Sequence, residues 1–141
     1  MLINTNNEMQ YLGTKENGKP LTAFIVDDSV AMVKIVARTL GDFGFNIIGS
    51  ANNGEEAIEN LSKIEDQIDL ITLDITMPKR DGISALPDIV KLKPNSKIIM
   101  VSALGDKNRV IESMQIGAHY YIVKPFRKET FYVVLRRTFK V

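Results

Sequence analysis

The sequence predicts an α/β fold of five β/α units, in which a parallel sheet is covered by helices on both faces. Short apolar runs bounded by polar or turn residues recur along the chain, as is typical of buried parallel strands. Stretches with apolar residues at helical spacing alternate with these runs. The connections are short, and right-handed crossovers then place helices on both sides of the sheet.

The first two units follow a polar beginning. A strand at Leu21–Val26 precedes a helix at about Ser29–Phe43, whose apolar residues share one face. The second strand is predicted at Asn46–Ser50. After it, Asn53 and Glu56 have the spacing of a capping box, which marks the start of the second helix.

The third unit begins with a strand at Leu70–Leu73. Its helix should start near Asp81 and Gly82, where the apolar positions recur at helical spacing. Pro87 lies inside this helix. A proline is tolerated near the first turn of a helix and would kink it further in.

The last two units complete the pattern. The fourth strand is predicted at Lys97–Val101 and the fourth helix at about Lys107–Gln115, with Gly117 as its C-terminal glycine. The fifth strand follows at Tyr120–Val123, and the last helix spans about Lys128–Phe139. The strand order does not follow from this pattern alone.

Composition limits the possible classes of function. The 141 residues suit one domain with a short extension, and 45% of them are hydrophobic, enough for a core. Because 18 basic and 17 acidic residues leave a net charge of +1, no basic excess indicates nucleic-acid binding. The absence of cysteine excludes disulfides and thiolate metal sites. With no apolar run of about 20 residues and no secretory signal, we expect a cytoplasmic location without membrane insertion.

The two ends of the chain differ in character. Residues 1–20 are polar and rich in asparagine, and we expect a mobile extension. Within it, Asn17-Gly18 is a hairpin-turn signal, and Met9–Leu12 is a candidate short edge strand. The basic residues near the other end are expected to form a solvated helix face, with contact to a phosphate or an acidic partner as the alternative. They are Arg127, Lys128, Arg136, Arg137 and Lys140.

Five polar residues stand at or just past the ends of predicted strands. They are Asp27, Asp28, Asp74, Ser102 and Lys124. The carboxyl ends of parallel strands form one rim, where ligands bind in open α/β sheets. The fold should therefore gather three carboxylates, a hydroxyl and an ammonium at one edge of the sheet.

Three carboxylates at close range favour a bound cation. Like charges would otherwise raise at least one pKa sharply, and Mg²⁺ is a hard cation that prefers oxygen ligands. The alternative is that some of these side chains only cap helices, which would suit Asp28 or Ser29. Lys124 should pair with a carboxylate or a phosphoryl oxygen, unless it extends to solvent. We hypothesise that a cis bond before Pro125 turns Lys124 inward.

The hydroxyl of Ser102 is poorly supported as a nucleophile. The chain has a single histidine, His119, which precedes a different strand and is expected to be a surface residue. Ser102 is better interpreted as a hydrogen-bond donor to an incoming oxyanion.

These residues lie in segments that resemble the receiver domain of two-component response regulators. The segments FIVDDS, LDITMPKRDG, VSALG and GAHYYIVKPF match that family in order and in spacing, over about residues 21–141. The resemblance implies a flavodoxin-like fold with strand order 2-1-3-4-5. It divides the chain into an N-terminal extension, residues 1–20, and a receiver domain, residues 21–141.

The resemblance also implies roles for the acidic residues. Asp74 would be the phosphoacceptor, which attacks the phosphohistidine of a sensor histidine kinase. Asp28, Asp74 and the backbone carbonyl of Thr76 would bind Mg²⁺, and Asp27 would act on the metal through water. Phosphoryl transfer needs in-line positioning and charge neutralisation more than covalent chemistry from the protein, so these roles agree with the interpretation from the residues alone.

The resemblance also implies roles for the other site residues, in phosphoryl transfer and in the conformational change that follows it. Lys124 and Ser102 would hold phosphoryl oxygens. On phosphorylation the hydroxyl of Ser102 would move toward the phosphoryl group and the ring of Tyr121 would turn inward; a plain core aromatic is the alternative for Tyr121. The fourth helix, fifth strand and fifth helix would then present the surface that partners recognise.

The function implied is a signalling switch and not an enzyme, apart from assistance to its own phosphorylation and dephosphorylation. Because the chain stops after the fifth helix, we expect a stand-alone receiver of the chemotaxis (CheY) type, which binds a flagellar motor switch protein or a phosphatase. The alternative is a phosphorelay intermediate that passes the phosphoryl group to a histidine phosphotransfer protein. A Mg²⁺-dependent phosphohydrolase with Asp74 as nucleophile is a rival from another class. A flavin carrier is disfavoured because no glycine-rich loop follows the first strand.

Overall fold

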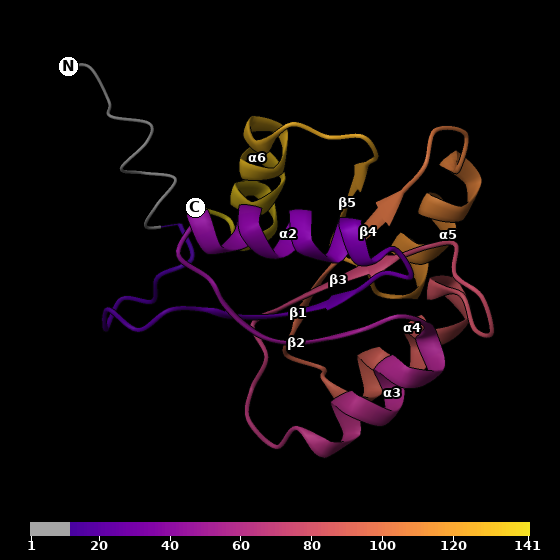
Figure 1. The fold of residues 1–141 in the computed structure, drawn as a ribbon, viewed down its shortest axis with the longest axis horizontal. Helices are drawn as coiled ribbons and strands as arrows, with labels where there is room; N and C mark the ends of the chain where they lie inside the picture. The colour runs from indigo at the N-terminus through magenta and orange to yellow at the C-terminus, as the bar shows by residue number, and fades with distance from the viewer. Residues whose placement is uncertain (1–11) are drawn as a thin grey trace.

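A parallel five-stranded sheet lies between two layers of helices in the computed structural model, which describes residues 12–141 (Figure 1). The strands are β1 (Thr22–Val26), β2 (Asn46–Ala51), β3 (Leu70–Asp74), β4 (Lys97–Ser102) and β5 (Tyr120–Val123). The helices are α2 (Val30–Asp42), α3 (Gly54–Lys63), α4 (Gly82–Leu92), α5 (Lys107–Ile116) and α6 (Lys128–Phe139). The strand order is β2-β1-β3-β4-β5, which confirms the flavodoxin-like topology.

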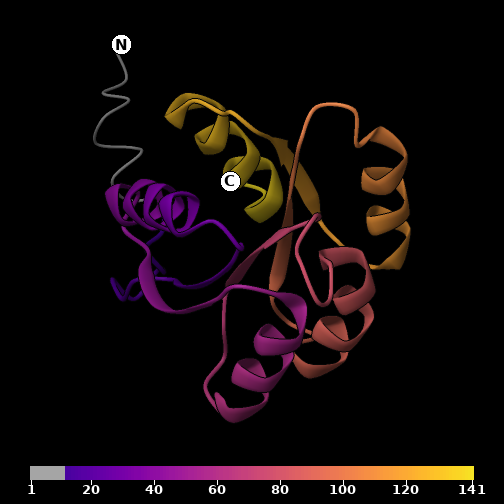
Figure 2. The ribbon, with the colours of Figure 1, turned by 45° about the vertical axis from the view of Figure 1, so that its right-hand side comes forward.

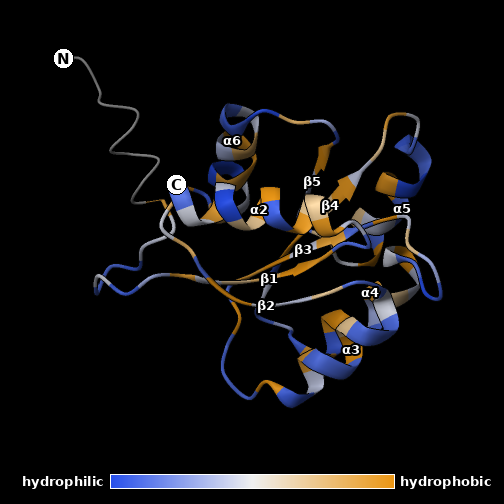
Figure 3. Cartoon of the chain, in the orientation of Figure 1, coloured by the Kyte–Doolittle hydropathy of each residue, from blue (hydrophilic) through white to orange (hydrophobic). Residues whose placement is uncertain are grey.

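The helices divide between the two faces of the sheet. Helices α2 and α6 cover one face, and α3, α4 and α5 cover the other (Figure 2). Residues alternate between the faces along each strand, so Ile25 packs with Leu40 and Phe131, whereas its neighbour Val26 packs with Leu61 and Leu86. The strands are the most apolar part of the chain, and polar residues lie on the outer sides of the helices (Figure 3).

Side-chain caps mark the starts of α2, α3 and α4. The Asn53 side chain accepts a hydrogen bond from the Glu56 N–H at 2.9 Å, as the capping-box spacing predicts. Asp81 caps α4 in the same way, which settles the start of that helix. Pro87 lies in the second turn of α4, and the helix continues through it. The loops that follow β1, β2 and β3 lie at one rim because these strands are parallel.

Part of the expected extension is attached to the domain. Asn17-Gly18 forms the turn of a hairpin in which Thr14 pairs with Pro20. The Gly13 N–H donates to the Phe43 carbonyl at 2.8 Å. Residues 13–20 therefore differ from the mobile extension expected from composition, because backbone hydrogen bonds hold them to the domain. The candidate edge strand at Met9–Leu12 falls mostly outside the described residues, and the division of the chain at residue 20 stays a prediction.

The basic residues near the C-terminus are exposed, as expected for a solvated helix face. They are Arg127, Lys128, Arg136, Arg137 and Lys140. Three of them contact other residues of this chain. Lys128 pairs with Asp42, Arg136 donates to the Val141 carbonyl, and Arg137 donates to the Tyr120 hydroxyl. Among residues 12–141, no helix is both long enough and apolar enough to cross a membrane.

Candidate functional site

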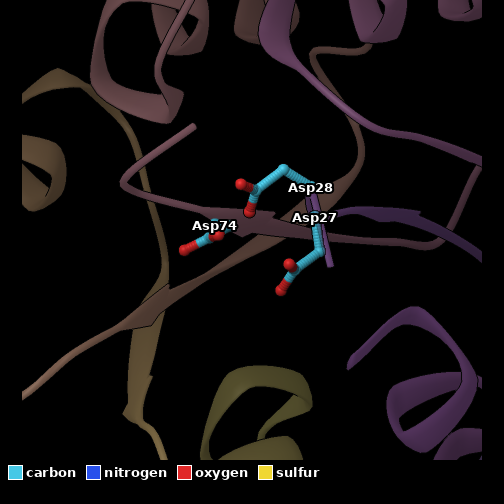
Figure 4. Close-up of side chains that lie close together, drawn as sticks. All are labelled: Asp27, Asp28 and Asp74. Atoms are coloured by element: carbon cyan, nitrogen blue, oxygen red, sulfur yellow. The ribbon is translucent and has the colours of Figure 1, made fainter. Parts of the chain in front are cut away.

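Three acidic side chains converge at the carboxyl ends of the central strands (Figure 4). Asp27 directly follows β1, and Asp74 is the last residue of β3, the strand beside it. Each of Asp27, Asp28 and Asp74 contributes one carboxylate oxygen to a group whose members all lie within 4.8 Å of one another. The side chains of Asp27 and Asp28 leave the strand end on opposite sides (Figure 4). Both carboxylates still belong to the cluster.

The backbone after β1 holds the Asp27 carboxylate in place. Asp27 is buried, and its carboxylate accepts a hydrogen bond from the Ser29 N–H at 2.9 Å. Ser29 in turn caps α2 by accepting from the Met32 N–H at 3.1 Å. The capping alternative therefore holds for Ser29 and is wrong for Asp28. The exposed Asp28 carboxylate has no hydrogen bond or ion pair to any other described residue.

Lys124 points into the cluster and not toward solvent. Its Nζ lies 3.3 Å from Asp74 Oδ2 and 3.5 Å from Asp27 Oδ2. The bond between Lys124 and Pro125 is cis, as hypothesised from the sequence. The Lys124 N–H also donates to the Ser102 carbonyl at 2.7 Å. The structure thus places one ammonium between two buried carboxylates.

The charges of this cluster do not balance. Burial raises the pKa of Asp74 from 3.8 to about 6, the charge of Asp27 adds to the increase, and Lys124 opposes it. Burial by itself would lower the pKa of Lys124, but the carboxylates of Asp74 and Asp27 outweigh it and the pKa is raised. Three ionised carboxylates and one ammonium carry a net charge of −3 + 1 = −2. A divalent cation with oxygen ligands fits this donor set.

We expect Asp74→Asn to stabilise the metal-free protein at neutral pH. The pKa of Asp74 is about 6 in the folded state and 3.8 in the unfolded chain, so ionisation of Asp74 lowers the free energy of unfolding. This loss of stability is absent below pH 3.8 and is complete once the pH has risen through 6. Asparagine resembles the protonated form at every pH. The variant should gain about 1 to 2 kcal/mol at pH 7.5 in EDTA, after allowance for solvent screening. Urea unfolding at pH 7.5 and at pH 4 measures this gain in stability. An equal gain at the two pH values would contradict a raised pKa of Asp74 in the folded protein.

Ser102 and Tyr121 lie on the side of the rim toward α5. The buried Ser102 hydroxyl donates to the Ile122 carbonyl at 3.4 Å and makes no hydrogen bond to the acidic cluster. Tyr121 is 40% exposed, and its ring stacks on Tyr120 with centroids 5.5 Å apart. Both Ser102 and Tyr121 line a groove of about 570 Å³ between α5 and β5, so Tyr121 is not a core aromatic.

Apolar side chains make up much of this groove, which also includes Leu104, Val110, Ile111 and Met114. Leu104 follows β4 and is 83% exposed. His119 is exposed, as expected, and its Nδ1 accepts a hydrogen bond from the Ile98 N–H at 3.0 Å. His119 therefore does not activate Ser102.

The sequence did not indicate one contact at the rim, made by Arg109 of α5. One guanidinium nitrogen donates to the Thr76 hydroxyl at 3.2 Å, and another lies 3.1 Å from Asp81 Oδ2. Thr76 and Asp81 flank the loop between β3 and α4. Arg109 and Thr76 are 33 residues apart in the sequence. No sequence pattern links two residues at that separation, so this bridge could not be predicted.

Comparisons with known proteins agree with this geometry. The response regulator receiver domain family matches residues 23–136. The chemotaxis protein CheY of Treponema pallidum is 37% identical over 125 residues, covering 89% of this chain and 87% of the relative. The chemotaxis protein CheY of Thermotoga maritima is 42% identical over 103 residues, covering 73% and 84%.

Solved structures give the same result. A chain in the crystal structure of the CheX-CheY-BeF3-Mg complex from Borrelia burgdorferi superposes with a TM-score of 0.86 at 39% identity, covering 92% of this chain and 98% of that chain. The chemotaxis protein CheY4 of Vibrio cholerae superposes with a TM-score of 0.74 at 28% identity, covering 84% and 98%. The likeness spans almost the whole length of these proteins.

Proposed function

The chain belongs to the response regulator receiver family, and from this membership we propose that it is a chemotaxis response regulator phosphorylated on Asp74. The observation that carries the proposal is the convergence of Asp27, Asp28 and Asp74 within 4.8 Å, beside the ammonium of Lys124. Such a cluster supports a covalent site for one phosphoryl group, because it combines a nucleophile with groups that neutralise the charge of the transferred phosphate.

The proposed reaction is a single displacement at phosphorus. A carboxylate oxygen of Asp74 attacks the phosphorus of a phosphohistidine on a sensor kinase. The phosphorus–nitrogen bond breaks, the imidazole leaves with the bonding electron pair and takes up a proton, and Asp74 becomes an acyl phosphate. Lys124 Nζ, already 3.3 Å from Asp74, would pair with a phosphoryl oxygen, and the Ser102 hydroxyl would donate to another. The domain thereby assists its own phosphorylation without being an enzyme.

Mg²⁺ is the proposed cofactor. Asp27, Asp28, Asp74 and the backbone carbonyl of Thr76 would hold it, with Asp27 acting through water. When bound, Mg²⁺ neutralises charge on the cluster and on the transferred phosphoryl group. The excess of carboxylates over ammonium groups in the cluster supports this assignment, and the similar chain from Borrelia burgdorferi was solved in a complex named with BeF3 and Mg.

Intact mass spectrometry tests the phosphoacceptor. Incubation with acetyl phosphate and MgCl₂ should add the mass of one phosphoryl group to the parent. EDTA in place of MgCl₂, or the substitution Asp74→Asn, should leave the mass unchanged. A phosphoryl adduct of equal yield on Asp74→Asn would contradict the proposal.

The proposed output surface consists of α5, β5 and α6. A phosphoryl group on Asp74 would draw the Ser102 hydroxyl toward it, and the Tyr121 ring, now 40% exposed, would turn inward. Both residues line the apolar groove between α5 and β5, so this movement would reshape a surface suited to a partner. A flagellar motor switch protein is the partner we propose, with a phosphatase of the CheX kind as a second, on the basis of the similar complex.

A binding comparison separates the chemotaxis role from the relay role. Protein treated with BeF₃⁻ and Mg²⁺ should bind a motor-switch peptide more tightly than untreated protein. Rapid loss of the phosphoryl group to a histidine phosphotransfer protein, without gain in peptide binding, would favour a phosphorelay intermediate instead.

We predict that Leu104 prolongs the phosphorylated state. Its side chain is exposed on the loop after β4, at the rim of the site, and an apolar group does not orient an attacking water by hydrogen bonding. Leu104→Glu and Leu104→Asn should each shorten the phosphoryl half-life several-fold, as followed by the decay of the phosphoryl adduct in Mg²⁺. Decay in the parent that equals or exceeds that of both variants would refute this.

A further inference from the structure

Arg109 joins two parts of the molecule that are far apart in sequence. It belongs to α5, and its guanidinium bridges the Thr76 hydroxyl at 3.2 Å and Asp81 Oδ2 at 3.1 Å. Thr76 lies two residues after Asp74, and Asp81 is the N-cap of α4. One planar group therefore ties together the start and the end of the loop that leaves the acidic cluster.

The backbone holds both ends of this loop. At the near end, the Ile75 N–H donates to the Val101 carbonyl at 3.1 Å. The Gly82 N–H donates to the Ile75 carbonyl at 2.8 Å, and the Gly54 N–H donates to the Arg80 carbonyl at 2.8 Å. For the Thr76 hydroxyl, Arg109 is the one hydrogen-bond partner within the part of the chain that the structure describes. Between these ends, Lys79 adopts a left-handed conformation with φ of 62°, a backbone state that a lysine rarely takes.

We propose that Arg109 is a positioning residue for the Mg²⁺ site. Its two-pronged contact holds the β3–α4 loop in the shape that presents the Thr76 carbonyl to the metal. This inference rests on the proposed function, which makes that carbonyl a ligand, and extends it to a residue outside the acidic cluster. Groups that orient metal ligands from outside commonly change metal affinity about 10- to 100-fold when they are removed.

The position of Arg109 also gives the site a link to the output surface. Arg109 reaches from α5 to the loop, while its neighbours Val110 and Ile111 line the apolar groove. A partner that shifts α5 would move the guanidinium that holds Thr76. By thermodynamic linkage, Mg²⁺ at the site and a partner in the groove would then influence each other's affinity.

Electrostatic repulsion and ligand positioning predict opposite changes in Mg²⁺ affinity when Arg109 is replaced. A guanidinium near a cation site repels the cation, so electrostatics alone would make Mg²⁺ bind more tightly to Arg109→Gln. Loss of a positioned ligand would make Mg²⁺ bind more weakly. The bridge is partly exposed, so its loss should leave overall stability nearly unchanged.

The test is a titration of MgCl₂ into unphosphorylated protein, followed by the backbone amide signals of the β3–α4 loop in NMR spectra. Arg109→Gln should raise the Mg²⁺ dissociation constant about tenfold. Arg109→Lys, which keeps the charge but not the fork, should raise it as well. Lys107→Gln is the matched control: it removes one positive charge from the same helix, and Lys107 has no side-chain hydrogen bond or ion pair to the described residues.

A double-mutant comparison shows whether Arg109 acts through Thr76. Thr76→Val removes the hydroxyl but keeps the backbone carbonyl, so adding it to Arg109→Gln should weaken Mg²⁺ binding by less than the product of the two single effects. Binding by Arg109→Gln that equals or exceeds that of Lys107→Gln would overturn the inference while leaving the proposed function intact. Failure of Mg²⁺ to shift the parent spectrum, or an equal shift in Asp74→Asn, would overturn both.

Discussion

Replacing Lys124 with methionine is expected to reduce phosphorylation by small donors about 100- to 1,000-fold. The Lys124 ammonium lies 3.3 Å from the Asp74 carboxylate, where it would pair with an incoming phosphoryl oxygen. Groups that stabilise charge at the reacting centre account for effects of this size when they are removed. The measurement is the initial rate at which the phosphoryl adduct forms with acetyl phosphate and saturating MgCl₂, followed by intact mass.

A gain of metal affinity separates this effect from misfolding. Lys124 competes with Mg²⁺ for the carboxylates of Asp74 and Asp27, so Lys124→Met should bind Mg²⁺ more tightly than the parent while it reacts more slowly. Lys128→Met is the matched control, because Lys128 forms an exposed ion pair with Asp42. A Lys124→Met rate within about threefold of the control would show that the ammonium stabilises no charge in the reaction.

Substituting alanine for Gly82 is expected to destabilise the domain by about 3 kcal/mol or more. A Cβ at this position would lie 2.1 Å from the carbonyl oxygen of Asp74, and the obstructing atom belongs to the backbone. The Gly82 N–H also donates to the Ile75 carbonyl at 2.8 Å, so α4 has no freedom to move away without losing that bond. Urea unfolding measures the loss.

The matched control for this substitution is Gly41→Ala. Gly41 lies in the last turn of α2, where an added Cβ has no other heavy atom within 4 Å. Alanine is a better helix former than glycine, so this variant should gain about 0.5 to 1 kcal/mol. Equal destabilisation of Gly82→Ala and Gly41→Ala would mean that the close approach between α4 and the end of β3 does not constrain the fold.

The fold and the acidic cluster follow from local features of the sequence. Each strand is a short apolar run, so the residues that end these runs, such as Asp74 and Lys124, are known to meet at the rim once the sheet is parallel. The capping pair Asn53 and Glu56 and the cap at Asp81 are likewise visible in the sequence, because they act over three residues. The strand order 2-1-3-4-5 needed the family resemblance.

Contacts that depend on side-chain direction were less predictable. Ser102 ends β4 as Asp74 ends β3, but its hydroxyl donates to the Ile122 carbonyl and not to a carboxylate of the cluster. The bridge from Arg109 to Thr76 spans 33 residues and depends on the angle between α5 and a loop. Sequence periodicity gives the face on which a residue lies but not the partner that it meets across a loop.

The most direct test of the central claim is chemical identification of the phosphorylated residue. Protein treated with acetyl phosphate and MgCl₂ is reduced with borohydride, which converts an aspartyl phosphate to homoserine, and is then digested and sequenced by mass spectrometry. We predict homoserine at position 74, with no conversion at Asp27 or Asp28 and none anywhere when EDTA replaces MgCl₂. Homoserine at Asp27 or Asp28 with Asp74 unchanged, or no conversion at all, would contradict the account.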